Sequence, residues 1–87
     1  MFRVDWVDDA VQDLARIWNK TAEFEHDAVR QAVVALDRAL QRHAATLGES
    51  READRRIAFV GPIFAEFIVE PRLSLVTVVR LGLSTRP

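Results

Sequence analysis

The sequence predicts an α+β domain with the order β-α-α-β-β-β, in which a two-helix hairpin packs on one face of an antiparallel sheet. At the start of the chain, over residues 2–7, apolar residues alternate with charged ones, as in a half-buried strand. Two longer segments then carry apolar residues at steps of three and four, which is typical of amphipathic helices. The third observation is a set of apolar runs of strand type, separated by turn residues: 55–60, 63–70 and 74–81.

The first helix is expected to follow the first strand directly. Asp8 or Asp9 would supply its N-cap and place acidic charge in its first turn. The helix is expected to end near Lys20 or Thr21. Its apolar stripe consists of Val7, Ala10, Val11, Leu14, Ile17 and Trp18.

A second, longer helix is expected from about Glu25 to Leu47, where Gly48 would end it. Val34 lies among its polar residues as an isolated exposed apolar side chain. Residues 48–54 are polar and without period, so they are expected to form a loop. The apolar stripe of this helix consists of Val29, Ala32, Val33, Leu36, Leu40, His43 and Leu47. The two helices are expected to pack on the sheet through Val11, Leu14, Trp18, Val33, Leu36 and Leu40.

The C-terminal third is expected to form an antiparallel meander. Gly61-Pro62 and Pro71-Arg72 are short separators, for which hairpins are the natural connections. The second and fourth strands would then flank the third, in a sheet of about four strands whose second face is free for binding. Residues 82–87 are expected to be a short tail.

Composition bounds the class of protein. The 87 residues suit one domain, 1–87, and 49% of them are hydrophobic, which supplies a core. No apolar run approaches the roughly 18–20 residues needed to span a bilayer, so no membrane partner is expected. The N-terminal residues lack the apolar region of a secretory signal, so a cytoplasmic location is expected. The absence of cysteine excludes disulfides and thiolate chemistry.

The charge balance disfavours a general nucleic-acid binder. Twelve basic residues against thirteen acidic ones give a net charge of −1, whereas such binders are usually basic. All the basic residues except Lys20 are arginines, which suits forked contacts to carboxylate or phosphate.

No metal or cofactor site is expected. His26 and His43 are the only histidines, and along one helix they would lie about 25 Å apart, too far to share a ligand. Glu66 and Glu70 would lie about 13 Å apart on one strand face, too far for a glycosidase-like pair. The three glycines stand singly, so no phosphate-binding loop is present.

An arginine constellation remains as the candidate site. Arg51 lies in the predicted loop, Arg55 and Arg56 open the second strand, and Arg80 lies near the end of the fourth. Because the second and fourth strands flank the third, Arg56 and Arg80 are expected to approach the same face as an anion-binding pair for phosphate of RNA or DNA. The alternative is that these arginines form ion pairs with nearby acids: Glu49, Glu52, Asp54, Glu66 or Glu70.

Several segments in order resemble the RelE/ParE superfamily of type II toxin–antitoxin toxins, over nearly the whole chain. Residues 9–18 are similar to the family's A-x-x-D-L-x-x-I-W first helix, after a Val4-Asp5-Trp6 strand. The segments that resemble its second helix, its Gly/Arg loop and its later strands are Ala35-Leu36-Asp37-Arg38-Ala39-Leu40, Gly48-Glu49-Ser50-Arg51, Arg56-Ile57 and Thr77-Val78-Val79-Arg80-Leu81.

The resemblance implies a toxin held inactive by a cognate antitoxin wrapped on its surface, in a toxin–antitoxin hetero-oligomer. Members of the family either cleave mRNA on the ribosome or poison DNA gyrase. By position, Arg51, Arg56 and Arg80 match basic residues of the family, as catalytic residues or as phosphate or target contacts.

The chain lacks some of the residue types that RNA-cleaving members of this family use. The chain has no Tyr, and no His follows His43. Arginine stabilises charge but is a poor base, so Glu66 or Asp54 would have to accept the proton. The resemblance therefore favours a toxin with an unresolved target. The alternatives are a ribosome-dependent endoribonuclease, and a gyrase-directed or decayed toxin without enzymatic activity.

Overall fold

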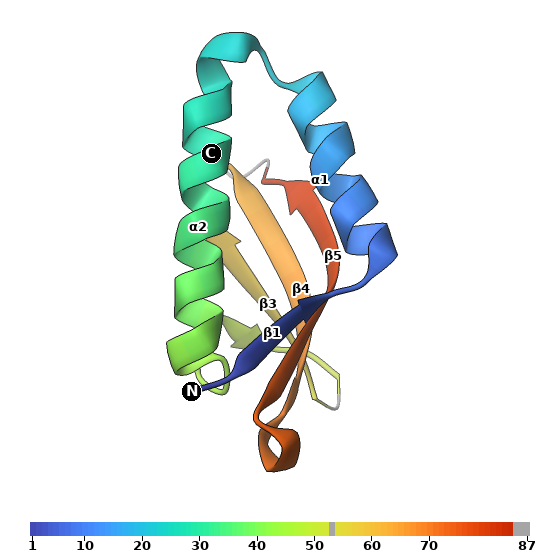
Figure 1. The fold of residues 1–87 in the computed structure, drawn as a ribbon, viewed down its shortest axis with the longest axis vertical. Helices are drawn as coiled ribbons and strands as arrows, with labels where there is room; N and C mark the ends of the chain where they lie inside the picture. The colour runs from blue at the N-terminus through green and yellow to red at the C-terminus, as the bar shows by residue number, and fades with distance from the viewer. Residues whose placement is uncertain (53, 85–87) are drawn as a thin grey trace.

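A computed structural model describes residues 1–52 and 54–84 of the chain and shows two helices on one face of a twisted sheet (Figure 1). Strand β1 (Arg3–Trp6) leads into α1 (Asp8–Lys20), and a 3₁₀ turn at Glu23–Glu25 leads into α2 (His26–His43). Four further strands and one 3₁₀ turn follow within the described residues: β2 (Glu49–Ser50), β3 (Arg55–Val60), β4 (Ile63–Glu70), η2 (Pro71–Leu73) and β5 (Leu75–Leu83). The α+β fold class predicted from the sequence is confirmed.

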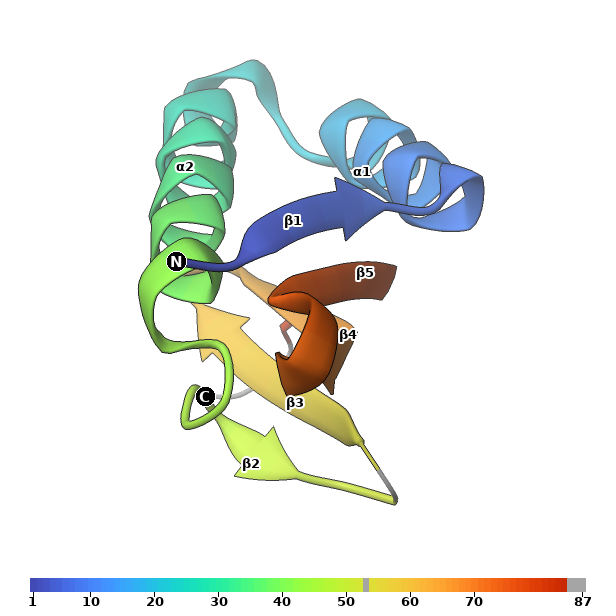
Figure 2. The same cartoon turned by 60° about the horizontal axis from the view of Figure 1, so that its bottom comes forward.

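The sheet has five strands in the order β1-β5-β4-β3-β2 (Figure 2). The meander β3-β4-β5 is antiparallel, as predicted. Strand β1 pairs in parallel with β5, from Arg3 opposite Leu75 to Trp6 opposite Val78, so the sheet is mixed rather than purely antiparallel. The fifth strand is β2, a two-residue edge strand within the segment that the sequence predicted as a loop.

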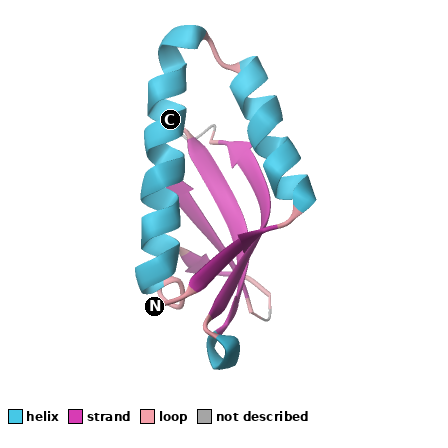
Figure 3. Cartoon of the chain, viewed as in Figure 1, coloured by secondary structure: helices cyan, strands magenta, loops and turns pink. Residues whose placement is uncertain are grey.

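The helices lie in the same order as predicted, with differences at their ends (Figure 3). The N-cap residue of α1 is Val7, which makes no side-chain cap, instead of Asp8 or Asp9. Asp8 and Asp9 lie in the first turn, where their negative charge interacts favourably with the helix dipole. Helix α2 ends at His43 instead of Leu47, and a turn follows in which Thr46 and Leu47 both donate their N–H to the His43 carbonyl.

The core lies between the helices and the sheet. Leu36 and Leu40 of α2 are buried, and Leu14, Trp18 and Val33 pack against the core, as predicted. His43 is exposed, because the neighbouring Ala44 takes the buried position at the end of the stripe. The sheet contributes a buried row from its three central strands: Ala58, Ile63, Ala65, Phe67, Val69, Val76, Val78 and Leu81.

The open face of the sheet carries the other half of each strand's side chains. On β4, Phe64, Glu66, Ile68 and Glu70 alternate with the buried row and are all partly exposed. The predicted tail begins later than expected, since 82 and 83 belong to β5 and 85–87 lie outside the described residues. Among the described residues, no helix is long and apolar enough to cross a membrane.

Candidate functional site

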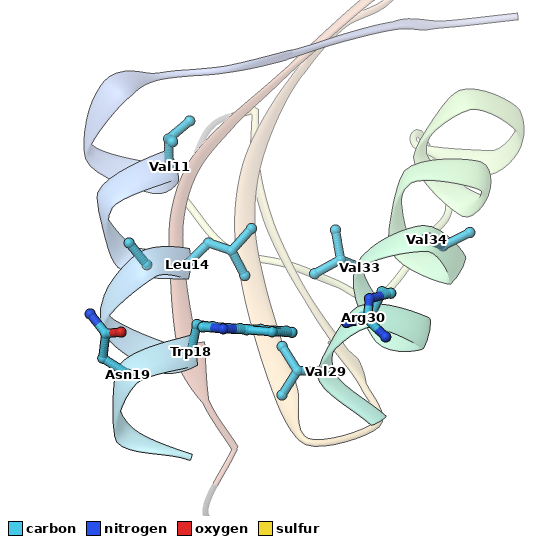
Figure 4. Close-up of a pocket in the computed structure, with 9 residues that line it drawn as sticks. Val11, Leu14, Trp18, Asn19, Val29, Arg30, Val33 and Val34 are labelled. Carbon is cyan, nitrogen blue, oxygen red and sulfur yellow. The ribbon is translucent and has the colours of Figure 1, made fainter. Parts of the chain in front are cut away.

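An apolar groove of about 510 Å³ lies between α1 and α2, on the side away from the open sheet face (Figure 4). The α1 wall is formed by Val11, Leu14, Ala15, Trp18 and Asn19. The α2 wall is formed by Val29, Arg30, Val33 and Val34. The sequence predicted that the two helical stripes pack on the sheet, but it did not indicate that the helices leave this groove between them.

The Trp18 indole extends from α1 across the groove toward α2 and closes its lower end in the view of Figure 4. The His26 ring stacks on the indole, with the ring centroids 3.7 Å apart, and the Arg30 guanidinium carbon lies 5.4 Å from the ring centroid. His26 Nε2 also lies 2.9 Å from the Trp18 carbonyl oxygen, and Thr21 Oγ1 donates to the same carbonyl. His26 therefore ties the two helices together, so its position next to the groove has a structural explanation.

Two valines in the groove are half exposed. Val11 is 52% exposed, so the prediction that it packs in the core is wrong, because it lies on the flank of α1 that faces the groove. Val34 is 47% exposed, which agrees with the sequence prediction, but it lines the same groove instead of standing alone. Half-exposed valines on facing walls leave apolar surface that a partner can cover.

Arginines border the α2 side of this groove. A second hollow continues it and is lined by Trp6, Val11, Leu14, Val33, Val34, Asp37, Arg38 and Gln41. A third lies on the outer flank of α2, where Arg30, Val34 and Arg38 follow one another at every fourth residue. Arg30 forms an exposed ion pair with Asp27, which is worth little energy and is easily exchanged.

The open sheet face brings together Arg55, Glu66 and Arg80. The Arg80 Cα lies opposite that of Glu66, but the Glu66 carboxylate forms its ion pair with Arg55. Arg80 instead lies against the ring of Phe64, at 5.4 Å from the guanidinium carbon to the ring centroid. No ion pair of Arg80 forms within residues 1–52 and 54–84, so its guanidinium is available to an external anion.

The expectation that Arg56 and Arg80 share a face is wrong. Arg56 lies opposite Phe67 and Arg80 opposite Glu66, and adjacent residues of β4 point to opposite faces of the sheet. Arg56 Nε donates to the Leu47 carbonyl oxygen at 2.9 Å, and its NH2 group donates to the Gly48 carbonyl oxygen at 3.1 Å. Arg56 therefore holds the segment that follows α2.

Arg51 lies apart from Arg56 and from Arg80. Its guanidinium is 3.9 Å from the Glu49 carboxylate, at the limit of an ion pair, and both side chains are exposed. A polar hollow on the open face contains Arg51 and the Arg55–Glu66 pair. Among the described residues, no cluster of three His, Asp or Glu side chains could hold a metal ion.

Substitution of Arg56 and of Arg80 should affect stability differently, because Arg56 binds backbone carbonyls and the Arg80 guanidinium is available to an external anion. We expect Arg56→Ala to lower the free energy of unfolding by about 1–3 kcal/mol, since two carbonyls lose their donor. Arg80→Ala should change it by less than about 0.5 kcal/mol, as is usual for an exposed site. Urea denaturation of both variants measures the difference, and equal stabilities would contradict the assignment.

Solved structures share this fold, although no protein-family model and no curated protein matches the chain. A chain of the chromosomal ParDE TA system from P. aeruginosa matches with a TM-score of 0.75 and 24% identity, covering 95% of this chain and 96% of that chain. The toxin–antitoxin complex RelBE2 from Mycobacterium tuberculosis gives 0.66 at 15% identity, covering 98% and 93%. The isolated E. coli RelE toxin gives 0.67 at 14% identity, covering 100% and 88%. The chain therefore has the RelE/ParE-type fold.

Proposed function

We propose that the chain is the toxin of a type II toxin–antitoxin pair and is neutralised by a cognate antitoxin. The observation that carries the proposal is the apolar groove between α1 and α2, on a fold shared with toxin–antitoxin proteins. Val11 and Val34 leave apolar surface half exposed there, and a neutralising partner would gain free energy by covering it.

The groove suits an amphipathic helix of the antitoxin. Both walls are helical, and a third helix can place apolar residues between them at steps of three and four. Arg30 and Arg38 stand about 12 Å apart along α2, at 1.5 Å per residue. Acidic residues on the antitoxin helix at a matching separation would meet both guanidinium groups and fix its register.

The groove and Arg80 lie on opposite sides of the sheet, so two activities can be separated. We assign antitoxin binding to the groove and contact with the toxin's target to the open face around Arg80. Glu66 lies opposite Arg80 on that face, but its carboxylate is engaged in an ion pair with Arg55. This arrangement favours target binding over RNA cleavage, with gyrase and the ribosome as the two targets to be compared.

Growth assays test the proposal. Expression of the chain alone in a bacterial host should stop growth, and co-expression of the product of the adjacent reading frame should restore it. Arg80→Ala should relieve growth inhibition but still bind that product, because Arg80 lies outside the groove. Arg72→Ala, an exposed arginine in the turn before β5, is the matched control and should remain inhibitory.

Three outcomes discriminate among the possibilities. Loss of supercoiling in a gyrase assay would identify a gyrase-directed toxin, and mRNA cleavage in a translation extract would identify an endoribonuclease. Binding of the adjacent product without growth inhibition would identify a decayed toxin. A chain that neither inhibits growth nor binds that product would contradict the proposal.

A further inference from the structure

Strand β5 carries one residue more than β4 where Arg80 emerges. Val78 lies opposite Phe67 and Arg80 lies opposite the preceding residue, Glu66, so Val79 is left as a β-bulge. Strict alternation after the buried Val78 would turn Arg80 toward the helices and Leu81 toward the open face. The bulge reverses this, so that Arg80 is exposed and Leu81 is buried.

The outer edge of β5 changes partner at the same place. Strand β1 pairs with β5 only as far as Val78, whose carbonyl oxygen accepts from Val7 N at 3.1 Å. Beyond that point α1 lies against β5, and Asp13 Oδ2 accepts a hydrogen bond from Leu81 N at 3.0 Å. The Asp13 carboxylate therefore satisfies a backbone donor that β1 does not reach.

Both partners of this hydrogen bond are held in place. Leu81 is only 5% exposed, so its N–H would be costly to leave unpaired. The Asp13 side chain is 15% exposed, and its second oxygen forms an ion pair with Arg16 one turn along α1. Such an anchored acceptor fixes the peptide plane between Arg80 and Leu81.

We propose that Asp13 is a positioning residue that holds the bulge at Val79 and thereby keeps Arg80 on the open face. The proposal does not depend on what Arg80 binds. Without the Asp13 acceptor, the extra residue can be taken up elsewhere along β5, and a slip of one residue exchanges the faces of neighbouring side chains. Arg80 would then turn toward the helices and Leu81 toward the open face, while Val79, which follows the inward-facing Val78, would keep its outward position.

The absence of cysteine from the sequence makes a direct test simple, because a single introduced thiol is the only one in the protein. The rate of reaction with a thiol reagent is measured in Arg80→Cys and in Leu81→Cys, each with and without Asp13→Ala. We expect Asp13→Ala to lower the rate at position 80 and raise it at the buried position 81, each by about tenfold, as an unpaired buried amide disfavours the present register. Thr77→Cys, on the same strand before the bulge, is the control and should be unaffected.

Two variants distinguish positioning from a general loss of structure. Asp13→Asn keeps an acceptor oxygen for Leu81 N and should restore both labelling rates, whereas general loosening would raise the rate at both positions. Arg16→Gln removes only the ion pair and should leave the Leu81 contact in place. Unchanged rates at positions 80 and 81 in a folded Asp13→Ala variant would overturn the proposal.

A second measurement needs no variant. The Leu81 amide of the unaltered protein should exchange its hydrogen slowly, at a rate close to that of the other protected amides of β5, although no neighbouring strand pairs with it on that edge. Fast exchange at Leu81 would also overturn the proposal, even if Asp13→Ala did not fold.

Discussion

Val11→Asp is expected to abolish binding of the antitoxin while leaving the chain folded. Val11 is 52% exposed, so the free chain can hydrate the new carboxylate, and its stability should change by less than about 0.5 kcal/mol. A partner that fills the groove would have to bury this charge among Leu14, Trp18 and Val34. Since burying an unpaired charge costs several kcal/mol, the affinity should fall by about 100-fold or more.

Calorimetric titration against the product of the adjacent reading frame measures this change, and co-expression tests its consequence for growth. The variant should remain inhibitory, because Arg80 lies on the other side of the sheet, but the antitoxin should no longer rescue growth. Leu73→Asp is the matched control: Leu73 is 66% exposed in the turn before β5, outside the groove, and its substitution should leave affinity unchanged. Equal affinities for Val11→Asp and the unaltered chain would place the antitoxin elsewhere.

The sequence predicted the elements that local pattern determines. The boundaries of α1, β3 and β4 agree with the runs of apolar periodicity and with the Gly61-Pro62 separator between the two strands. Strand β2 could not be predicted, because its two residues are Glu49 and Ser50 and only their pairing with Ile57 and Arg56 makes them a strand. The parallel pairing of β1 with β5 also depends on long-range contacts that periodicity does not encode.

The groove between the helices was not predicted, for a similar reason. The apolar stripes of the two helices identified Leu14, Trp18 and Val33 as residues that pack against the sheet. The groove depends on the distance between the two helices, which the apolar pattern of one helix does not determine. The face of Arg80 depends on the bulge at Val79. One trace of the bulge was present in the sequence, since the buried positions Val76, Val78 and Leu81 change from a step of two to a step of three.

The role of Arg56 shows how strand position alone misleads. A charged residue that opens a strand is readily interpreted as part of a surface patch, and its resemblance to family positions favours that interpretation. The acceptors of its guanidinium are backbone carbonyls of Leu47 and Gly48, which belong to a turn eight or nine residues earlier in the chain. That turn is held from both sides, by Arg56 and by the close approach of Gly48 to β3.

Gly48→Ala is expected to be among the most destabilising single substitutions in the chain. Gly48 has φ = +69°, and an added Cβ would lie 2.1 Å from the Ile57 carbonyl oxygen and 2.9 Å from the Ala58 Cα. The positive φ costs about 1–2 kcal/mol for a residue with a Cβ, and the backbone clash adds a further 1–3 kcal/mol. A loss of about 3 kcal/mol should lower the midpoint of thermal unfolding by roughly 12–24 °C in a domain of this size.

Gly61→Ala provides the matched control for the Gly48 substitution, because it separates the two costs. Gly61 also has a positive φ, +54°, but its added Cβ would meet only the Ala32 side chain, at 3.4 Å. Gly61→Ala should therefore lower the free energy of unfolding only by the conformational cost of the positive φ, about 1–2 kcal/mol. Thermal unfolding of both variants, followed by circular dichroism, should show a clearly larger loss for Gly48→Ala. Equal losses would mean that the turn moves away from β3 without cost, and that its close approach to β3 does not contribute to holding it in place beside Arg56.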